Sequence, residues 1–217
     1  MFNQLPAPLN GAQLEAARIS PVQGFDVYPD VLYSTILYPQ AGQPVGTPLK
    51  FFQGAESVPS DTSLTNVTQN GLPGGQKFHA RAFFVVPFIE ASTVTVPATL
   101  DGTGLVRDID RVFKTNRGQW TWTQTNINRT RGPFPLDAVG EQGGLLPDFG
   151  GNNAPAAGNN AVYQHGRTAA IGGWPMDFII FETETFPVNL TWGVQTAIQT
   201  AMLLQCRFYG WRYIKTG

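Results

Sequence analysis

The sequence predicts an all-β fold in a single domain, and three observations carry this prediction. Short segments rich in aromatic and β-branched residues recur along the 217 residues, each bounded by turn-forming residues. Glycine and proline are abundant, with 24 and 17 residues, as expected of a chain with many turns. Only residues 106–113 space their apolar side chains as a helix does. Because β-sandwiches often reach about 200 to 250 residues as one domain, the length fits a single sandwich.

Residues 1–24 predict an N-terminal arm that precedes one domain over residues 25–217. Its prolines leave room only for a short helix-capable stretch, residues 11–18. The arm nevertheless carries apolar side chains that a free tail should not expose, namely Phe2, Leu5, Leu9 and Leu14. We therefore expect the arm to pack on its own domain or on a neighbouring protein.

Strand signals begin directly after the arm. Residues 26–38 predict one or two strands, because Pro29 is expected to break the run, and residues 49–52 predict a short strand. The clearest signal is 77–91, where alternation places every second residue from Phe78 to Phe88 on one face. The second half of this segment is apolar on both faces, which predicts a strand that enters a doubly covered interior. Residues 94–100 predict its partner.

The middle of the chain predicts the one helix and a further strand. Residues 106–113 predict a helix of two to three turns. Residues 119–125 then alternate strictly, with Trp120 and Trp122 on one face and threonines on the other, so both tryptophans are expected in the core. Residues 132–160 predict a long loop with apolar anchors, which are Phe134, Leu136, Val139, Leu145, Leu146 and Phe149.

The last third predicts three more strands, over residues 177–183, 186–192 and 202–213. Eight or so strands, with long loops and one short helix, favour a sandwich of two sheets, either a jelly roll or a relative of it. The pattern leaves the order of the strands open. The prediction is therefore a single jelly-roll β-sandwich with long loops.

Charged residues are scarce, and this observation favours an assembly subunit. They make up 13% of the chain, about half the usual share, whereas aromatic residues reach 12%. Soluble proteins normally need charge to stay dispersed, so we expect much of this surface to be hidden against other protein. The net charge of −1 argues against binding of duplex nucleic acid. The basic stretch within residues 107–131 is interrupted by Asp108 and Asp110 and is interpreted as solvated or subunit-facing.

The sequence offers no convincing catalyst, metal site or cofactor site. Glu182 and Glu184 have a spacing that a paired-carboxylate glycosidase could use, but we interpret them as a solvated rim. His79 and His165 lack carboxylates at ligand spacing and are expected to be structural. Cys206 is the only cysteine, which excludes a disulfide within the chain, and it is expected to be buried in a strand. We therefore expect that the protein is not an enzyme.

No apolar run of 18 residues occurs, and the N-terminus lacks the basic segment and apolar region of a secretory signal. We therefore expect synthesis in a cytoplasm, where the protein stays until it assembles.

Several stretches resemble the jelly-roll coat proteins of tailless icosahedral bacteriophages, many of which enclose a membrane. The similarity covers roughly residue 51 to the C-terminus and consists of turn residues and strand spacing. It is carried by LTN at 64–66, GLP at 71–73, DIDRVF at 108–113, RGPFPL at 131–136, GGL at 143–145, FPVNLTW at 186–192 and YGWR at 209–212.

The resemblance implies a capsid subunit of the virion, made in the host cytoplasm, that builds trimeric or pseudo-hexameric capsomers of an icosahedral shell. Its partners would be copies of itself and other virion proteins, with an internal lipid membrane left open as a further partner and no direct contact with nucleic acid. The predicted subunit contacts are Phe2, Leu5, Leu9, Leu14, Phe134, Leu145, Leu146 and Phe149.

Two alternatives remain open at this point. One is a carbohydrate-binding or glycan-cleaving sandwich, in which Trp120, Trp122 and Trp174 stack on sugar rings beside Asp177 or Glu182. The other is a phage spike or decoration protein, which would form trimers without closing a shell.

Overall fold

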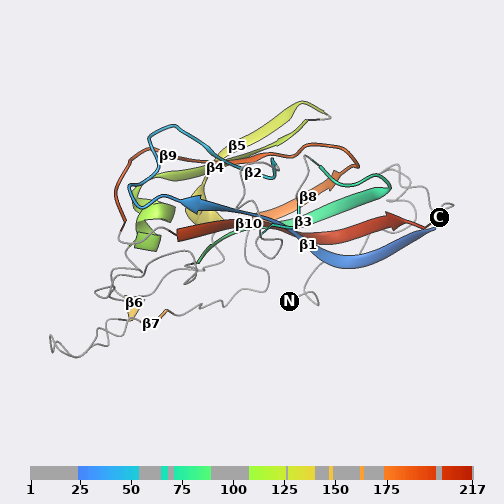
Figure 1. Ribbon diagram of the computed structural model, residues 1–217, viewed down its shortest axis with the longest axis horizontal. Coiled ribbons are helices and arrows are strands. Elements are labelled where there is room, and N and C mark those ends of the chain that lie inside the picture. Colours follow the sequence, from blue (N-terminus) through green and yellow to red (C-terminus); the bar gives the residue numbers. More distant parts are fainter. Residues whose placement is uncertain are drawn as a thin grey trace.

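The computed structural model describes residues 24–53, 65–67, 71–88, 108–125, 127–139, 147–148, 162–163, 174–198 and 202–216. Within them, two four-stranded antiparallel sheets stack face to face (Figure 1). Sheet A has the order β1-β10-β3-β8, and sheet B has the order β2-β9-β4-β5. The predicted arm and the strand predicted over residues 94–100 lie outside the described residues.

The strands of sheet A are β1 (Phe25–Tyr38), β3 (Gln76–Phe88), β8 (Trp174–Ile180) and β10 (Met202–Lys215). Those of sheet B are β2 (Leu49–Phe51), β4 (Gly118–Gln124), β5 (Arg129–Pro135) and β9 (Val188–Trp192). A separate pair joins β6 (Pro147–Asp148) to β7 (Val162–Tyr163). Residues 108–110 are α-helical and continue as the π-helical η2 (Arg111–Thr115), and a 3-10 turn, η3 (Leu136–Ala138), follows β5.

The pairing of the eight sandwich strands is nested. β1 pairs with β10, β2 with β9, β3 with β8 and β4 with β5, all antiparallel. This is the pattern of one long hairpin whose tip lies between β4 and β5. Rolling that hairpin up brings β3 beside β10 and β4 beside β9, which are the remaining pairs. An eight-stranded sandwich formed in this way is a jelly roll, so the predicted fold class is confirmed.

Aromatic side chains fill the space between the sheets. Trp120 and Trp122 of β4 are 0% and 3% exposed, which confirms that they are core residues. Trp192 of β9 is also buried, and its indole N–H donates a hydrogen bond to the carbonyl oxygen of Val112 at 2.7 Å. This bond ties η2 to the end of the sandwich and satisfies the one polar group of a buried tryptophan. Phe208 of β10 packs on Phe83 of β3, with ring centroids 4.9 Å apart.

Two predicted boundaries are wrong for the same reason, the tolerance of edge strands for proline. β1 continues through Pro29 as a single strand, although Pro29 was expected to break it. β5 occupies residues 129–135, whereas the predicted loop began at residue 132. β1 and β5 each lie at one edge of a sheet. An edge strand has backbone N–H groups that pair with no neighbour, so prolines such as Pro29 and Pro133 break no ladder bond there. Residues 108–115 are helical, so the predicted helix ends two residues later than expected, while its predicted start at residue 106 lies outside the described residues.

A β-bulge changes the face on which the residues of β3 lie. The register of β3 shifts between Ala80 and Ala82, both against β8 and against the Tyr209/Gly210 step of β10. Phe78 and Ala80 therefore belong to the core, but beyond the bulge Phe83 and Val85 take the core positions. The prediction of one continuous face from Phe78 to Phe88 is wrong, because one extra residue reverses the alternation. The expected burial of both faces is confirmed, since Phe84 is also only 3% exposed.

Within the described residues, no helix is both long enough and apolar enough to cross a bilayer.

Candidate assembly surfaces

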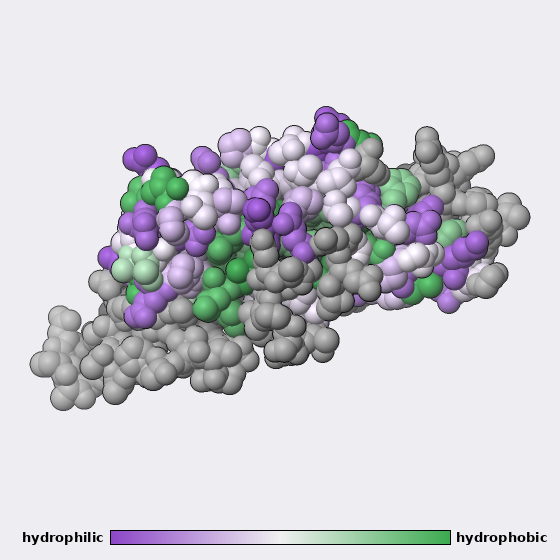
Figure 2. Space-filling model, turned by 45° about the horizontal axis from the view of Figure 1, so that its top comes forward, coloured by the Kyte–Doolittle hydropathy of each residue, from purple (hydrophilic) through white to green (hydrophobic). Residues whose placement is uncertain are grey.

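The outer face of sheet B is polar. Alternation along β4 and β9 turns their tryptophans inward and turns outward the side chains that are partly or fully exposed. Those outward residues are Gln119, Thr121, Thr123, Asn189 and Thr191, with Lys50 of β2 beside them. The side that carries sheet B is turned forward in Figure 2, where it is mostly pale to purple. This polar face is what a solvated sandwich surface requires.

The outer face of sheet A carries an apolar cluster beside polar side chains, among them Gln205 and Arg207 of β10. Ala82 and Phe84 of β3 and Tyr209 of β10 form a buried cluster, and Val31 of β1 packs against it. The rings of Phe84 and Tyr209 meet edge to face, with centroids 4.8 Å apart. The residues lie on the side of the sheet that faces away from the sandwich core, because the core cluster takes Phe83 and Phe208 of the same strands. The two sides of the molecule thus differ in chemistry.

A polar cluster joins the edge strand β8 to β3. The imidazole of His79 is buried, and its Nε2 lies 2.7 Å from Oδ1 of Asp177, whose side chain is 76% exposed. The Nη1 atom of Arg81 donates to the same oxygen at 2.9 Å. The other ring nitrogen of His79, Nδ1, is buried and has no hydrogen-bond partner. This geometry suits a neutral imidazole that donates from Nε2, because protonation would place an unpaired N–H at the buried Nδ1.

The ionisation of this cluster follows from the geometry. Burial lowers the pKa of His79 below its ordinary value of 6.5, although the hydrogen bond to Asp177 partly raises it. The hydrogen bond from His79 lowers the pKa of Asp177 below 3.8, partly opposed by burial of the carboxyl. The sequence could not reveal this pair, since the two residues lie 98 positions apart. Within the described residues, no group of three metal-ligating side chains forms.

Acidification is therefore expected to destabilise the fold. Because the folded-state pKa of His79 is lowered, the unfolded chain takes up a proton first as the pH falls below about 6.5, and stability declines until the folded His79 titrates. The lowered pKa of Asp177 acts in the same direction at lower pH, below its ordinary 3.8. Denaturant unfolding between about pH 7.5 and about pH 5 measures the effect of His79.

A His79→Gln variant should lose most of this pH dependence. Equal pH dependence in the wild type and in His79→Gln would contradict the prediction.

The acidic pair at residues 182 and 184 is structural. Glu182 is exposed and accepts a hydrogen bond from the backbone N–H of Gly75. Glu184 is 5% exposed and accepts one from the N–H of Phe181 at 3.0 Å. Thr183 between them has a positive φ of 59°, so the pair lies in a turn and not on one strand face. The interpretation as a solvated rim is thus wrong for Glu184, because the turn folds its carboxylate back onto the backbone.

The three tryptophans named for sugar stacking are packed inside the protein. Trp120 and Trp122 are buried, and the ring of Trp122 stacks on Phe178 at 4.2 Å. Trp174 is partly buried, with its ring 4.8 Å from Phe134 and 5.8 Å from Trp120. Sugar platforms need open ring faces, so this arrangement gives the glycan-binding alternative no support.

Cys206 is buried, as predicted. Burial raises the pKa of its thiol well above 9.0. A thiol in this state is a poor nucleophile, because the thiolate is the reactive form.

Of the predicted subunit contacts, only Phe134 lies within the described residues. It is partly buried and packs on Trp120, with ring centroids 5.0 Å apart, at the edge where β5 meets β8. The other seven lie outside the described residues, namely Phe2, Leu5, Leu9, Leu14, Leu145, Leu146 and Phe149.

The large apolar side chains that are exposed in the described part of the chain were not singled out from the sequence. They are Val27, Tyr28, Leu37, Val45 and Ile127, which are 40 to 61% exposed. Val27 and Tyr28 lie near the start of β1, and Ile127 lies in the turn between β4 and β5.

A cavity of about 160 Å³ lies beside the first half of β1. Leu32, Leu72 and Arg212 are among its lining residues. The guanidinium of Arg212 is ion-paired with Asp30 and donates to the side-chain oxygen of Gln76 at 2.6 Å. The cavity wall is thus close to neutral, since the one cation on it is paired. Asp30 consequently has its charge balanced inside its own chain.

No protein-family model matches the chain, and no curated protein or solved structure matches it significantly.

Proposed function

We propose that this chain is a structural protein of a virion, a capsid subunit that self-assembles through capsomers into an icosahedral shell. The observation that carries the proposal is the chemical difference between the outer faces of the two sheets. A solitary sandwich is expected to have polar outer faces on both sheets, whereas here the outer face of sheet A also carries Phe84 and Tyr209 in an apolar cluster, whose members are 6% exposed or less within the chain itself. A shell subunit needs two sides of different character, because only one of them faces the medium.

Composition and topology support the same proposal. A content of only 13% charged residues suits a molecule whose flanks are covered by siblings, since interface centres are depleted of charge and enriched in aromatic residues. The jelly roll is the fold of many viral capsid domains, although lectins and cupins share it, so the fold alone does not assign the function. The proposal places the protein in the virion after synthesis in a host cytoplasm, with copies of itself and other virion proteins as partners.

Self-association is the expected result when the purified chain is studied by native mass spectrometry and light scattering. At micromolar concentration we expect trimers or hexamers, because obligate interfaces of this kind bury more than about 2,000 Å² each. Electron microscopy of concentrated samples should then show capsomers, sheets or shells. A strict monomer with measurable affinity for glycans would overturn the proposal in favour of a carbohydrate-binding sandwich.

The same measurement separates the spike or decoration alternative. A spike protein should stop at a trimer however concentrated the sample, whereas a coat protein should continue to larger assemblies.

A further inference from the structure

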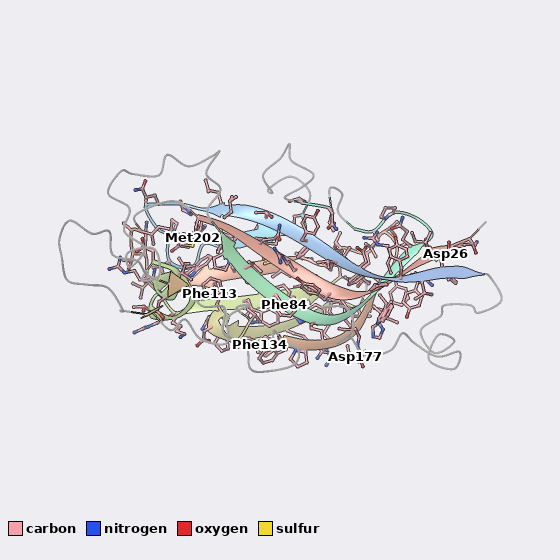
Figure 3. All side chains as sticks on the ribbon, turned by 90° about the horizontal axis from the view of Figure 1, so that it is seen from below. Asp26, Phe84, Phe113, Phe134, Asp177 and Met202 are labelled. Atoms are coloured by element: carbon pink, nitrogen blue, oxygen red, sulfur yellow. The ribbon has the colours of Figure 1, made fainter. Side chains whose placement is uncertain are left out.

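The sandwich ends in an edge strand on each of two opposite flanks. β1 is the edge of sheet A on one flank, and β5 is the edge of sheet B on the other. Figure 3 shows Asp26 of β1 at one end of the long axis and Phe134 of β5 on the lower side, nearer the middle. The contact between Phe134 and Trp174 confirms that β5 and β8 share their flank. We call the exposed strand surfaces the β1 flank (residues 25–30) and the β5 flank (residues 127–135).

The two edge strands β1 and β5 carry opposite charge, although β8, which shares the flank of β5, adds the exposed Asp177 beside Arg81. β1 contains Asp26 and Asp30 and no basic residue, whereas β5 contains Arg129 and Arg131 and no acidic residue. Asp30 is already paired with Arg212, so Asp26 is the carboxylate that the β1 flank presents. Asp26 and both arginines are exposed, and within the described residues none of the three forms an ion pair. Arg131 lies over the ring of Trp122, 5.6 Å from its centroid.

The charges also lie at the same end of the sandwich. Arg129 is opposite Gln124 in the β4–β5 pair, and the side chain of Gln124 donates to the carbonyl of Ile179 at 3.1 Å. Through His79 and Trp211, Ile179 is in register with Pro29 of β1. Arg129 is thus level with Pro29, three residues or about 10 Å along the strand from Asp26. When a second copy is related to the first by a rotation about an axis parallel to the strands, each residue keeps its height along that axis. Such a rotation can bring the β1 flank of one copy against the β5 flank of the other.

Apolar side chains accompany the charges. Val27 and Tyr28 are each 40% exposed beside Asp26, and Ile127 is 55% exposed next to the β5 arginines. Such a mixture of apolar side chains and arginine is typical of interface centres. Pro29 and Pro133 lack the N–H groups that a continuous sheet between two copies would need, so the contact is expected to run through side chains.

We propose that the β1 flank of one copy binds the β5 flank of a second copy, with the negative charge of Asp26 attracted by Arg129 and, farther along the strand, by Arg131. This inference rests on the proposed function and identifies the contact by which copies would associate. The contact is heterologous, since two different surfaces meet. A heterologous contact forms a ring when the rotation between neighbours closes, as a capsomer requires.

Charge reversal tests the contact. Asp26→Arg makes both flanks basic, and Arg129→Asp with Arg131→Asp makes both acidic, so each variant should associate at least about tenfold more weakly than the wild type at low salt. A chain that carries all three substitutions has both flanks reversed and should regain association. Native mass spectrometry and sedimentation give the oligomeric states, and the thermal unfolding midpoint shows whether each variant remains folded.

Mixing the acidic-flank and basic-flank variants gives the sharpest result. Each chain can then bind only the other kind, so only rings with an even number of subunits should form. Lys114→Asp is the matched control, because Lys114 is exposed on η2 and belongs to neither flank, and it should associate like the wild type.

The outcomes separate the two proposals. If the wild type assembles and the reversed variants assemble equally well, the flank contact is wrong while the proposed function stands. If the wild type is a monomer at every concentration, the proposed function fails and the contact with it. Odd-numbered rings in the mixture would also overturn the heterologous contact.

Discussion

Replacing Trp120 with alanine is expected to lower the free energy of unfolding by about 3–5 kcal/mol, the range for removal of a large aromatic side chain from a core. Trp120 is 0% exposed and lies in β4, between the two sheets. Its ring centroid is 4.7 Å from that of Phe83 and 5.0 Å from that of Phe134, so one side chain links β4 to both β3 and β5. An alanine would leave a cavity that these strands could close only by moving closer together, against the packing of their other side chains.

Denaturant unfolding of the isolated variant measures this loss, and Thr121→Ala is the matched control. Thr121 is the next residue of the same strand but points to the polar outer face, so its removal should cost no more than about 0.5–1 kcal/mol. Trp120→Phe should cost less than Trp120→Ala, partly because the indole Nε1 is buried without a hydrogen-bond partner. Equal losses for Trp120→Ala and Thr121→Ala would mean that the β4 alternation is misassigned.

The core tryptophans were predictable because the information is local. Polar and aromatic residues alternate over residues 119–123, so Trp120 and Trp122 lie on the same face of the strand. Turning that face toward the core is the only orientation that buries both tryptophans. The class of the fold followed in the same way, from many short segments of this kind. The order of the strands did not follow, because the nested pairing joins residues as distant as Phe25 and Lys215, and alternation within a strand says nothing about its neighbour.

The errors arise where backbone geometry overrides the local pattern. The bulge near Arg81 inserts one residue and exchanges the faces of β3, although the sequence around it alternates without interruption. The strand β5 was not predicted because it contains Pro133. A proline costs a strand a ladder hydrogen bond only when its position would face a neighbouring strand, and the sequence does not show which strands lie at an edge. Glu184 was expected in solvent, but the positive φ of Thr183 turns it inward.

The candidate surfaces were predicted only in outline. The sequence indicated apolar contacts, and Phe134 is the one predicted contact residue that falls in the described part of the chain. The charged residues of the two flanks can be read from the sequence, but their positions on the surface cannot. Those positions depend on β1 and β5 being edge strands of different sheets. The partnership of His79 with Asp177 likewise exists only because β3 pairs with β8.

Gly210→Ala is expected to destabilise the protein by about 3 kcal/mol, at the upper end of the usual cost of overpacking. Gly210 lies in β10, opposite Ala80 at the bulge of β3. A Cβ at this position would overlap the carbonyl oxygen of His79 and would lie 2.9 Å from its carbon and 3.0 Å from a ring carbon of Phe78. Backbone in the centre of a sheet cannot rotate aside, so β3 and β10 would have to separate.

Gly74→Ala is the control, because a Cβ there meets nothing within 4 Å and Gly74 has no left-handed φ. It should leave the unfolding midpoint unchanged or raise it slightly, since alanine restricts the unfolded chain. A Gly210→Ala variant as stable as the wild type would show that β10 does not approach β3 this closely. The close fit between Gly210 and β3 would then not be what holds the bulge in place. That bulge is what directs Ala82 and Phe84 to the outer side of sheet A.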